Sequence, residues 1–487
     1  PLELATQEME KALEQSDLDK WAAADDRFHR TMLEMHGNHR LSNFVKLLYD
    51  QVHRARIITL RLRERPVRST IEHREILKHM LAGDAEAVRR TFRAHHQRAA
   101  NELLPILEKY YKNQTLPARR IANVSPSIAV IKGDGIGPDV TEAALAAVEA
   151  ALKRAGEQKP NYAGIHAGAT YFKENGKDIE NGGEERAGEA DAIFLGAIGL
   201  PVIRHADGTE IAPHLRLRER YQLYAGVRPV RAYANTPRSL ADPRSANIDL
   251  VILRESTEGL FYSAATHNRS QVVGDDEVRD ILRITRAGCE RVHRFGFELA
   301  RKRKAQGKPG HITCVDKANV FRSMAFFREI FDEVAKAYPD VTKAYNYIDA
   351  QALDLIRRPW DFDILVMENM FGDILSDLAG GLVGGMGMAA CAEIGDETAL
   401  FQPAHGSAPD IMGQDKANPL AAILSGALMC DYLGDKLDRQ TYRDAATIID
   451  EAVESGFEQD RLRPIEFGGD MGTRAITKEV LDIITSR

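Results

Sequence analysis

Two aspartates, Asp373 and Asp377, stand four residues apart in the stretch VMENMFGDILSDLAGG. If this stretch is helical, both carboxylates lie on one face, where like charges repel each other. Either water screens that repulsion on an acidic surface, or a divalent cation binds between the two side chains. On these residues alone the acidic surface is the simpler interpretation, and half of a metal site is the alternative.

Arginines near the ends of expected strands suggest a receptor for carboxylates. Arg218 and Arg228 lie in HLRLRERYQLYAGVRPV, and Arg254 lies in LRESTEG. One arginine is a surface residue by default, but three guanidinium groups together match carboxylate geometry bidentately. Later segments supply Lys317 in CVDKANVF, Asp349 in YNYIDA, and a loop with Gly406, Asp410 and Asn418 in QPAHGSAPDIMGQDKANP.

A glycine-rich turn, IKGDGIGPDV, joins an expected strand to a helix that begins near Val140. Turns of this kind often bind phosphates through backbone amides. This one is not GxGxxG, however, and a tight strand-to-helix turn also explains the glycines. Both interpretations remain open from the sequence.

The elements that must position these residues fall into two unlike regions. Residues 1–115 contain little glycine and show helical spacing, as in AEAVRRTFRAHHQRAANELLPILEKYY, which predicts an all-α bundle. Residues 116–126 lose the periodicity and read as a linker. Over residues 127–487, apolar runs such as SIAVIKGDG, ADAIFLGA, IDLVILRE and DFDILVMEN alternate with helical segments, which predicts an α/β fold.

Composition limits the class of protein. The 487 residues have a net charge of -7, which gives no basic footprint for nucleic acid. Four cysteines without CxxC pairing fit a reducing compartment, so we expect the cytoplasm. No apolar run is long enough for a membrane span, and no export segment is apparent. Because the chain begins at Pro1, we consider a fragment or a processed product.

Residues 126–487 resemble the isocitrate/isopropylmalate dehydrogenase family, the metal-dependent β-decarboxylating dehydrogenases. The motifs quoted above occur in the order of that family, followed by GGDMGTRAITKEVL. The resemblance implies the family fold and the oxidation of a 2-hydroxy acid with loss of its β-carboxylate as carbon dioxide. It also implies Mg²⁺ or Mn²⁺, which would polarise the forming ketone.

The same resemblance implies a role for each charged residue. Asp373 and Asp377 would hold the metal from one subunit and Asp349 from its partner, so the family implies a homodimer with shared sites. Lys317, also from the partner, would deprotonate the substrate hydroxyl, because a nearby cation lowers a lysine pKa. The residues that would clamp the substrate carboxylates are Arg218, Arg228 and Arg254.

The cofactor implied by the resemblance is NAD. Asp410 would accept hydrogen bonds from ribose hydroxyls and repel the 2′-phosphate of NADP. Gln402 departs from the glutamate usual before this loop. The cofactor-binding residues implied are His405, Gly406, Ser407, Ala408, Asp410 and Asn418.

The substrate is less defined. Isopropylmalate enzymes have leucines before the first arginine, and isocitrate enzymes have serine and asparagine there. Here the stretch is IAPHLRLR, with Ala212 and His214, and neither pattern is reproduced. His214 either binds a polar substituent of the substrate or packs within its helix.

The position of the family tyrosine also departs from the pattern. In RESTEGLFYS this position, counted from Arg254, holds Phe261, and Tyr262 follows. In an extended segment Tyr262 would face the opposite side and act as a packing residue. In a bulge or turn its hydroxyl could reach the site and protonate the enolate, and we favour this second case.

Residues 1–112 resemble the FCD effector domain of GntR-type regulators, including its D-x-x-F-H motif. One carboxylate and three imidazoles predict a divalent-metal site, for an ion such as Zn²⁺ or Ni²⁺. No winged helix is present and the first effector helix is missing, so we expect a truncated domain and no DNA binding. The predicted ligands are Asp25, His29, His73 and His95.

Two functions compete at this stage. The first is NAD-dependent, Mg²⁺- or Mn²⁺-dependent oxidative decarboxylation of a malate-type 2-hydroxy acid, such as 3-isopropylmalate, D-malate, tartrate or an isocitrate-like acid. The rival is a metal- and carboxylate-binding regulator with a degenerate enzyme domain. Retention of Lys317, Asp349, Asp373 and Asp377 favours the enzyme.

Overall fold

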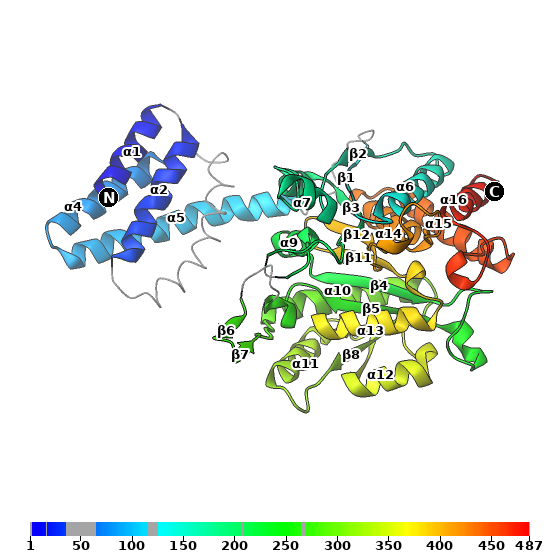
Figure 1. The fold of residues 1–487 in the computed structure, drawn as a ribbon. Helices are drawn as coiled ribbons and strands as arrows, with labels where there is room; N and C mark the ends of the chain where they lie inside the picture. Colours follow the sequence, from blue (N-terminus) through cyan, green and yellow to red (C-terminus); the bar gives the residue numbers. More distant parts are fainter. Residues whose placement is uncertain are drawn as a thin grey trace. The chain divides into compact units, whose positions relative to one another are not determined.

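The protein is described from a computed structural model, which covers residues 2–15, 17–35, 65–114, 125–206, 208–263 and 269–486. The chain divides into two compact units, Pro1–Arg120 and Ile121–Arg487 (Figure 1). Each unit has its own hydrophobic core. Almost all of the predicted linker, residues 116–126, lies outside the described residues.

The first unit is helical, as predicted. The Asp17 side chain caps α2 by accepting the Lys20 amide, which satisfies one of the free N–H groups at that end. Met9, Phe28 and Ile76 are fully buried where the helices pack together. Its helices are α1 (Leu2–Glu14), α2 (Leu18–Glu34), α4 (Val67–Leu81) and α5 (Ala85–Gln114).

The second unit is built on a ten-stranded mixed sheet with the order β2-β1-β3-β12-β11-β4-β5-β10-β8-β9. The strands β6 (Gln271–Val273) and β7 (Glu277–Arg279) form a separate hairpin (Figure 1). The strands of the large sheet are β1 (Ser127–Gly133), β2 (Asn161–Gly164), β3 (Ala192–Ala197), β4 (Ala225–Arg231), β5 (Asp249–Glu255), β8 (His311–Asp316), β9 (Thr342–Tyr347), β10 (Ile364–Met367), β11 (Ala390–Ile394) and β12 (Ala399–Pro403).

Helices cover both faces of this sheet, as expected for strands with almost continuous apolar runs. Packed on the first face are α6 (Gly137–Arg154), α10 (Arg286–Ala305), α11 (Arg322–Ala335), α14 (Leu420–Leu437), α15 (Gln440–Glu458) and α16 (Thr473–Ser486). The second face is covered by α8 (Gly183–Glu189), α9 (Pro213–Arg220), α12 (Ile348–Arg357) and α13 (Asn369–Leu382), with α7 (Ala169–Asn175) preceding α8. The predicted fold class is confirmed.

Alternation along the central strands decides which residues face α13. In β5, Val251 and Leu253 belong to the core of the first face, whereas Leu250 and Ile252 belong to that of the second. Because side chains alternate with a period of two, Arg254 continues the second face. The side chains of the central strands that face α13 can therefore form a site, and the opposite side chains form core.

None of the helices within the described ranges is long and apolar enough to cross a membrane.

Candidate active site

Arg254 of β5 lies beneath the start of α13, and its side chain is only 2 % exposed. It donates from Nε to Asn369 Oδ1 at 2.7 Å and pairs with Asp373. A Cβ atom on Gly372 would lie 2.6 Å from Arg254 Cβ, so glycine lets the helix approach this closely. Burial and the nearby charge of Arg228 lower the pKa of Arg254 to about 10, which still leaves it cationic at neutral pH.

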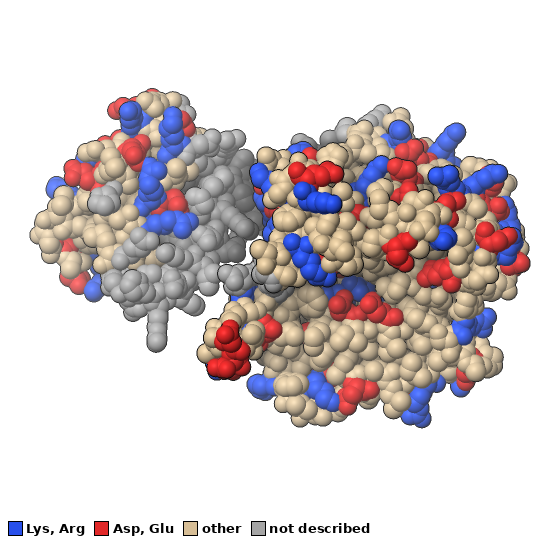
Figure 2. Space-filling model, viewed as in Figure 1, with Lys and Arg blue, Asp and Glu red and all other residues tan. Residues whose placement is uncertain are grey.

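Arg228 of the neighbouring strand β4 reaches the same helix one turn later. It is buried and donates from Nη1 to Ser376 Oγ at 2.6 Å. The same nitrogen lies 3.6 Å from Asp373 Oδ1 and 3.9 Å from Asp377 Oδ1. In Figure 2 acidic and basic atoms gather in a hollow of the larger unit, over the region of β4, β5 and α13 in Figure 1.

Asp373 and Asp377 therefore share one face of a helix, as their spacing predicts, but the face is not an isolated acidic surface. Their side chains are 41 % and 62 % exposed, so oxygens remain open to a ligand. Burial raises the pKa of Asp377, and the charge of Asp373 adds to this, although Arg228 opposes it. Two accessible carboxylates in this arrangement fit a hard divalent cation, which prefers oxygen ligands.

Lys317 and Asp349 meet at the edge of the sheet. Lys317 follows β8 and Asp349 lies in the first turn of α12, which follows the adjacent parallel strand β9. Lys317 Nζ lies 2.6 Å from Asp349 Oδ1. This hydrogen bond lowers the pKa of Asp349. The predicted base and the third predicted metal ligand are thus neighbours.

Within one chain, Asp349 does not form a three-residue metal cluster with the two aspartates of α13. For the portion of the chain that is described, the only group of three metal-binding side chains whose ligand atoms lie within 4.8 Å of one another is His29, His73 and His95. Asp349, Asp373 and Asp377 do not form such a group among the described residues.

Phe261 and Tyr262 lie in a short 3₁₀ helix, Leu260–Ser263, rather than in an extended segment. The Phe261 ring packs against Arg254, with the guanidinium carbon 4.8 Å from the ring centroid. The Tyr262 ring instead contacts two other guanidinium groups, of Arg269 at 4.4 Å and Arg283 at 4.1 Å. The turn places Phe261, and not Tyr262, beside the predicted substrate arginine. The catalytic role of Tyr262 stays a prediction, and this geometry does not support it.

Arg218 and His214 lie on α9. Arg218 is buried, and its Nη2 lies 2.9 Å from Glu393 Oε1 on β11. Burial, with the charges of Arg218 and Arg254, lowers the pKa of His214 to about 3, so its imidazole is neutral near pH 7. Sequence reasoning overlooked Glu393, although an acid within the apolar strand ACAEI indicates a buried partner of opposite charge.

The loop predicted to bind the cofactor follows β12. Ser407 is held by two hydrogen bonds. Its hydroxyl donates to the Gly199 carbonyl, and its own carbonyl accepts a hydrogen bond from the Ile136 amide at 2.9 Å. Asp410 is exposed, whereas Asn418 donates to Glu466 Oε2 at 2.9 Å. An exposed carboxylate on a fixed loop can accept hydrogen bonds from a ligand.

The rest of this loop also has a defined backbone. His405 Nδ1 hydrogen bonds the carbonyl of Gly406, and burial lowers the pKa of the imidazole. Ala408 adopts the left-handed conformation with φ of 37°. The predicted cofactor residues thus lie in one loop and the start of the segment after it.

The glycine-rich turn packs against this loop, and three of its backbone amides are already bonded within the protein. The amides of Asp134, Ile136 and Gly137 all donate to backbone carbonyls. A Cβ on Gly135 would lie 1.9 Å from the Ser407 carbonyl oxygen, so close backbone approach explains this glycine. The structural interpretation of the turn is therefore favoured over phosphate binding.

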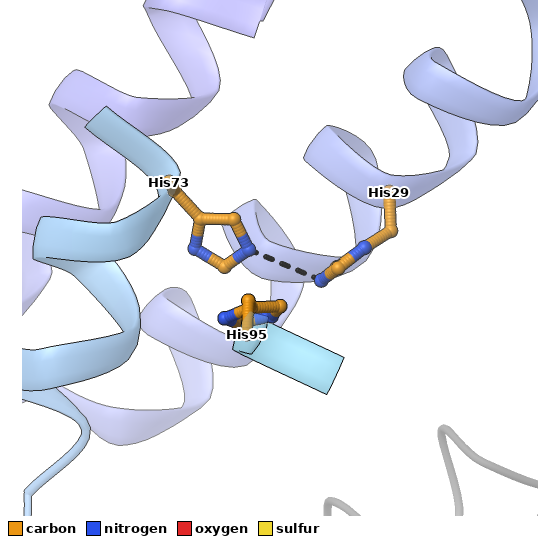
Figure 3. Close-up of side chains that lie close together, drawn as sticks. All are labelled: His29, His73 and His95. Carbon is orange, nitrogen blue, oxygen red and sulfur yellow. Dashed lines mark hydrogen bonds between the residues drawn. The ribbon is translucent and has the colours of Figure 1, made fainter. Parts of the chain in front are cut away.

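In the helical unit, His29, His73 and His95 point toward one another from three helices (Figure 3). His73 Nε2 lies 3.1 Å from His29 Nε2, and Asp25 Oδ1 lies 3.7 Å and 3.6 Å from these two nitrogens. All four side chains are buried. Nitrogens bound to one zinc ion lie roughly 3 Å apart or slightly more, so the predicted residues fit a divalent metal.

His95 is oriented by a carboxylate behind it. Its Nδ1 lies 2.7 Å from Glu72 Oε2, so Nδ1 must carry the hydrogen that the carboxylate accepts. Arg98 holds Glu72 through two hydrogen bonds of 2.6 Å. These bonds keep the lone pair of His95 Nε2 available for a cation, the usual arrangement behind metal-binding histidines.

Comparison with known proteins agrees with both units. Residues 127–484 match the model of the isocitrate/isopropylmalate dehydrogenase family, and residues 1–98 match that of the FCD domain. The chain belongs to the isocitrate/isopropylmalate dehydrogenase family. It is therefore an oxidoreductase of the β-decarboxylating dehydrogenase class with an FCD domain in the same chain.

Relatives within the family differ in the acid named as substrate. The chain is 39% identical to a 3-isopropylmalate/3-methylmalate dehydrogenase of Methanocaldococcus jannaschii, over 72% of this chain and 97% of the relative. It is 37% identical to a homoisocitrate dehydrogenase of the same organism, over 74% and 98%. An isocitrate dehydrogenase structure from Methylococcus capsulatus matches with a TM-score of 0.63 and 33% identity, covering 74% of this chain and 99% of that one.

Proposed function

We propose that the protein catalyses the NAD-dependent, Mg²⁺- or Mn²⁺-dependent oxidative decarboxylation of a malate-type 2-hydroxy acid. The observation that carries this proposal is the meeting of Arg228 and Arg254 with Asp373 and Asp377 at α13. Cations for the substrate carboxylates and anions for a metal lie side by side there. This is what a metal-chelated hydroxy acid requires.

In this proposal the side chains of the protein bind the substrate and move its proton. Arg228 and Arg254 hold the carboxylates, because buried guanidinium groups bind them strongly. The amine of Lys317 accepts the hydroxyl proton, and Asp349 beside it holds the resulting ammonium group in position. When bound, the metal would polarise the forming ketone and stabilise the charge left after decarboxylation, and NAD would accept the hydride.

The preference for NAD rests on Asp410. Its exposed carboxylate can accept hydrogen bonds from ribose hydroxyls and repels a 2′-phosphate. We expect kcat/KM for NAD to exceed that for NADP by about tenfold or more, which is the size of such electrostatic discrimination. Equal values for the two cofactors would contradict this role.

A homodimer with shared sites is part of the proposal. Exposed apolar side chains occur close in sequence to Lys317, Asp349 and Asp373: Val320, Phe321, Leu353, Ile356 and Ile374. Apolar side chains also remain exposed on the β6–β7 hairpin: Val272, Val273 and Val278. Patches of this kind mark association surfaces, and one next to Lys317, Asp349 and Asp373 would complete the site.

For the helical unit we propose a bound divalent metal, such as Zn²⁺ or Ni²⁺, held by Asp25, His29, His73 and His95. The support is the short separation of the imidazole nitrogens and the orientation of His95 by Glu72. A metal at this buried site could bind a small carboxylate, which would add a sensing role to the enzyme.

The proposal is tested by following NADH at 340 nm with D-malate, tartrate, 3-isopropylmalate and isocitrate. Mn²⁺ is supplied in one series and excess EDTA in the other. Turnover of at least one acid with Mn²⁺, and none with EDTA, is expected. Turnover of none of the four, by protein whose fold is verified by circular dichroism, would favour the regulator over the enzyme.

A further inference from the structure

Glu393 lies among the substrate arginines, although the roles proposed above do not use it. It is fully buried on β11, the strand next to β4 in the sheet. In β11, Ala390 and Ala392 belong to the core of the first sheet face, so Glu393 points to the other face, toward α13. The acid therefore shares its face of the sheet with Arg228 and Arg254.

A glycine makes room for this carboxylate. Glu393 pairs with Gly226 of β4, and Gly226 pairs in turn with Arg254 of β5. A Cβ on Gly226 would lie 3.0 Å from Glu393 Oε2 and 3.3 Å from Arg254 Cβ. The absence of a side chain at this position lets the acid and the arginine occupy the space between their two strands.

The charge of Glu393 is held in place by its surroundings. Its Oε1 lies 2.9 Å from Arg218 Nη2, and both side chains are almost inaccessible, at 0% and 8% exposed. Burial alone would raise the pKa of Glu393, but the charges of the three arginines lower it below its ordinary value. The carboxylate is therefore ionised near neutral pH and engages one of the three guanidinium groups.

His214 adds an uncharged group beside this ion pair. His214 lies four residues before Arg218 on α9, so the two side chains share a helix face, and its Nδ1 is buried with no hydrogen-bond partner in the described ranges. A buried ring nitrogen of this kind can bond a substrate hydroxyl. It offers no positive charge to a carboxylate.

We propose that Glu393 is a specificity-determining residue. By binding Arg218, it makes the site favour dicarboxylates with an uncharged substituent at C3 over tricarboxylates. Malate and tartrate are such dicarboxylates, whereas isocitrate carries a carboxymethyl group on C3 and so a third carboxylate. The carboxylate of the carboxymethyl substituent would meet a buried anion and a neutral imidazole where it needs a free cation, which is discrimination by repulsion. This inference rests on the proposed function and narrows its substrate class.

The variant Glu393→Gln tests the inference, because it keeps the shape of the side chain and removes its charge. The ratio of kcat/KM for isocitrate to that for D-malate should rise by about tenfold or more, as expected when a like charge is removed from a binding site. Glu393→Asp keeps the charge and should keep the wild-type ratio within about threefold. A ratio unchanged in Glu393→Gln would overturn the inference, as would a wild-type enzyme that prefers isocitrate.

The matched control is Glu454→Gln. Like Glu393, Glu454 is paired with an arginine, Arg231 of β4. Its side chain, however, is 40% exposed and lies outside the site. It should leave the ratio unchanged. If Glu393→Gln does not fold, Glu393→Ser removes the same charge with a smaller side chain and gives the same readout.

A binding measurement separates this inference from the proposed function. The rise in Tm of each variant with Mg²⁺ and either D-malate or isocitrate needs no turnover. The wild type should be stabilised more by D-malate, and Glu393→Gln should reverse or abolish that difference. No NADH production with any acid would overturn the proposed function, whereas equal stabilisation of the wild type by the two acids would overturn the role of Glu393.

Discussion

Asp373 and Asp377 lie next to two buried arginines, so the repulsion that their spacing implies on a free helix is offset by positive charge. The arginines do not enclose them, because both carboxylates remain accessible. Each aspartate can therefore interact with a buried guanidinium group on its protein side and with a metal cation on its solvent side. Because only a few carboxylates would bind the metal, removing the negative charge of one aspartate should weaken metal binding.

The variant Asp373→Asn should raise the Mn²⁺ concentration for half-maximal turnover by about 100-fold or more, because a hard cation loses an anionic ligand. The measurement is a Mn²⁺ titration of initial rates. Asp435→Asn is the control, since Asp435 is an ion-paired carboxylate on α14 that takes no part in the site. A titration midpoint unchanged in Asp373→Asn would remove this residue from the metal site.

The variant Tyr262→Phe separates the two interpretations of the RESTEGLFYS segment. The Tyr262 ring lies between Arg269 and Arg283, and phenylalanine keeps those contacts. We therefore expect kcat to change by less than about threefold, measured on the best substrate. A fall of about 10²-fold would instead identify Tyr262 as the proton donor that replaces the family tyrosine.

Sequence spacing predicted which residues of α13 lie together, but it did not predict which residues of the strands meet. The four-residue interval placed both aspartates on one helix face, because helical periodicity depends only on local structure. Glu393 gave no comparable signal, since its partners come from α9, β4 and β5 and are distant in the sequence. The position of Tyr262 was hard to predict for a related reason: one 3₁₀ turn decides which of two adjacent rings lies beside Arg254.

Strand order and register bring the charged groups together. β11, β4 and β5 are consecutive in the sheet although β11 comes more than one hundred residues later in the chain than β5. The alternating strands and helices of this unit could be predicted from the apolar runs. This order could not, because apolar runs do not specify which strands become neighbours. Because β11 pairs antiparallel with β4 in this register, Glu393 lies opposite Gly226.

The helices of the first unit hold their metal ligands independently of that sheet. We expect Zn²⁺ or Ni²⁺ in the dialysed full-length protein, lost in His73→Ala and in His95→Ala, because each removes a buried nitrogen ligand. Dehydrogenase turnover should stay within about twofold of the wild type, since the ligands belong to a separate unit. Metal content is measured by inductively coupled plasma mass spectrometry.

The control for this experiment is His79→Ala, on the same helix α4 but outside the cluster. It should keep the metal. If both His73→Ala and His95→Ala keep it as well, these residues are not ligands.

The proposed homodimer has shared active sites, in which Lys317 and Asp349 of one subunit meet Asp373 of the other. Lys317→Ala and Asp373→Asn should each be almost inactive as homodimers. Coexpressed, they should recover about a quarter of wild-type activity, because half of randomly paired dimers are mixed and each mixed dimer has one intact site. The measurement is the initial rate of the copurified mixture, and no recovery would place the complete site within one subunit.

The reaction itself is tested by measuring NADH and carbon dioxide together, with D-malate or whichever acid is turned over best. We expect one carbon dioxide for each NADH, no product of either kind in excess EDTA, and recovery of both when Mn²⁺ is restored. NADH formed without carbon dioxide, or an undiminished rate in EDTA, would contradict the assignment of the α13 carboxylates and arginines to metal-dependent oxidative decarboxylation.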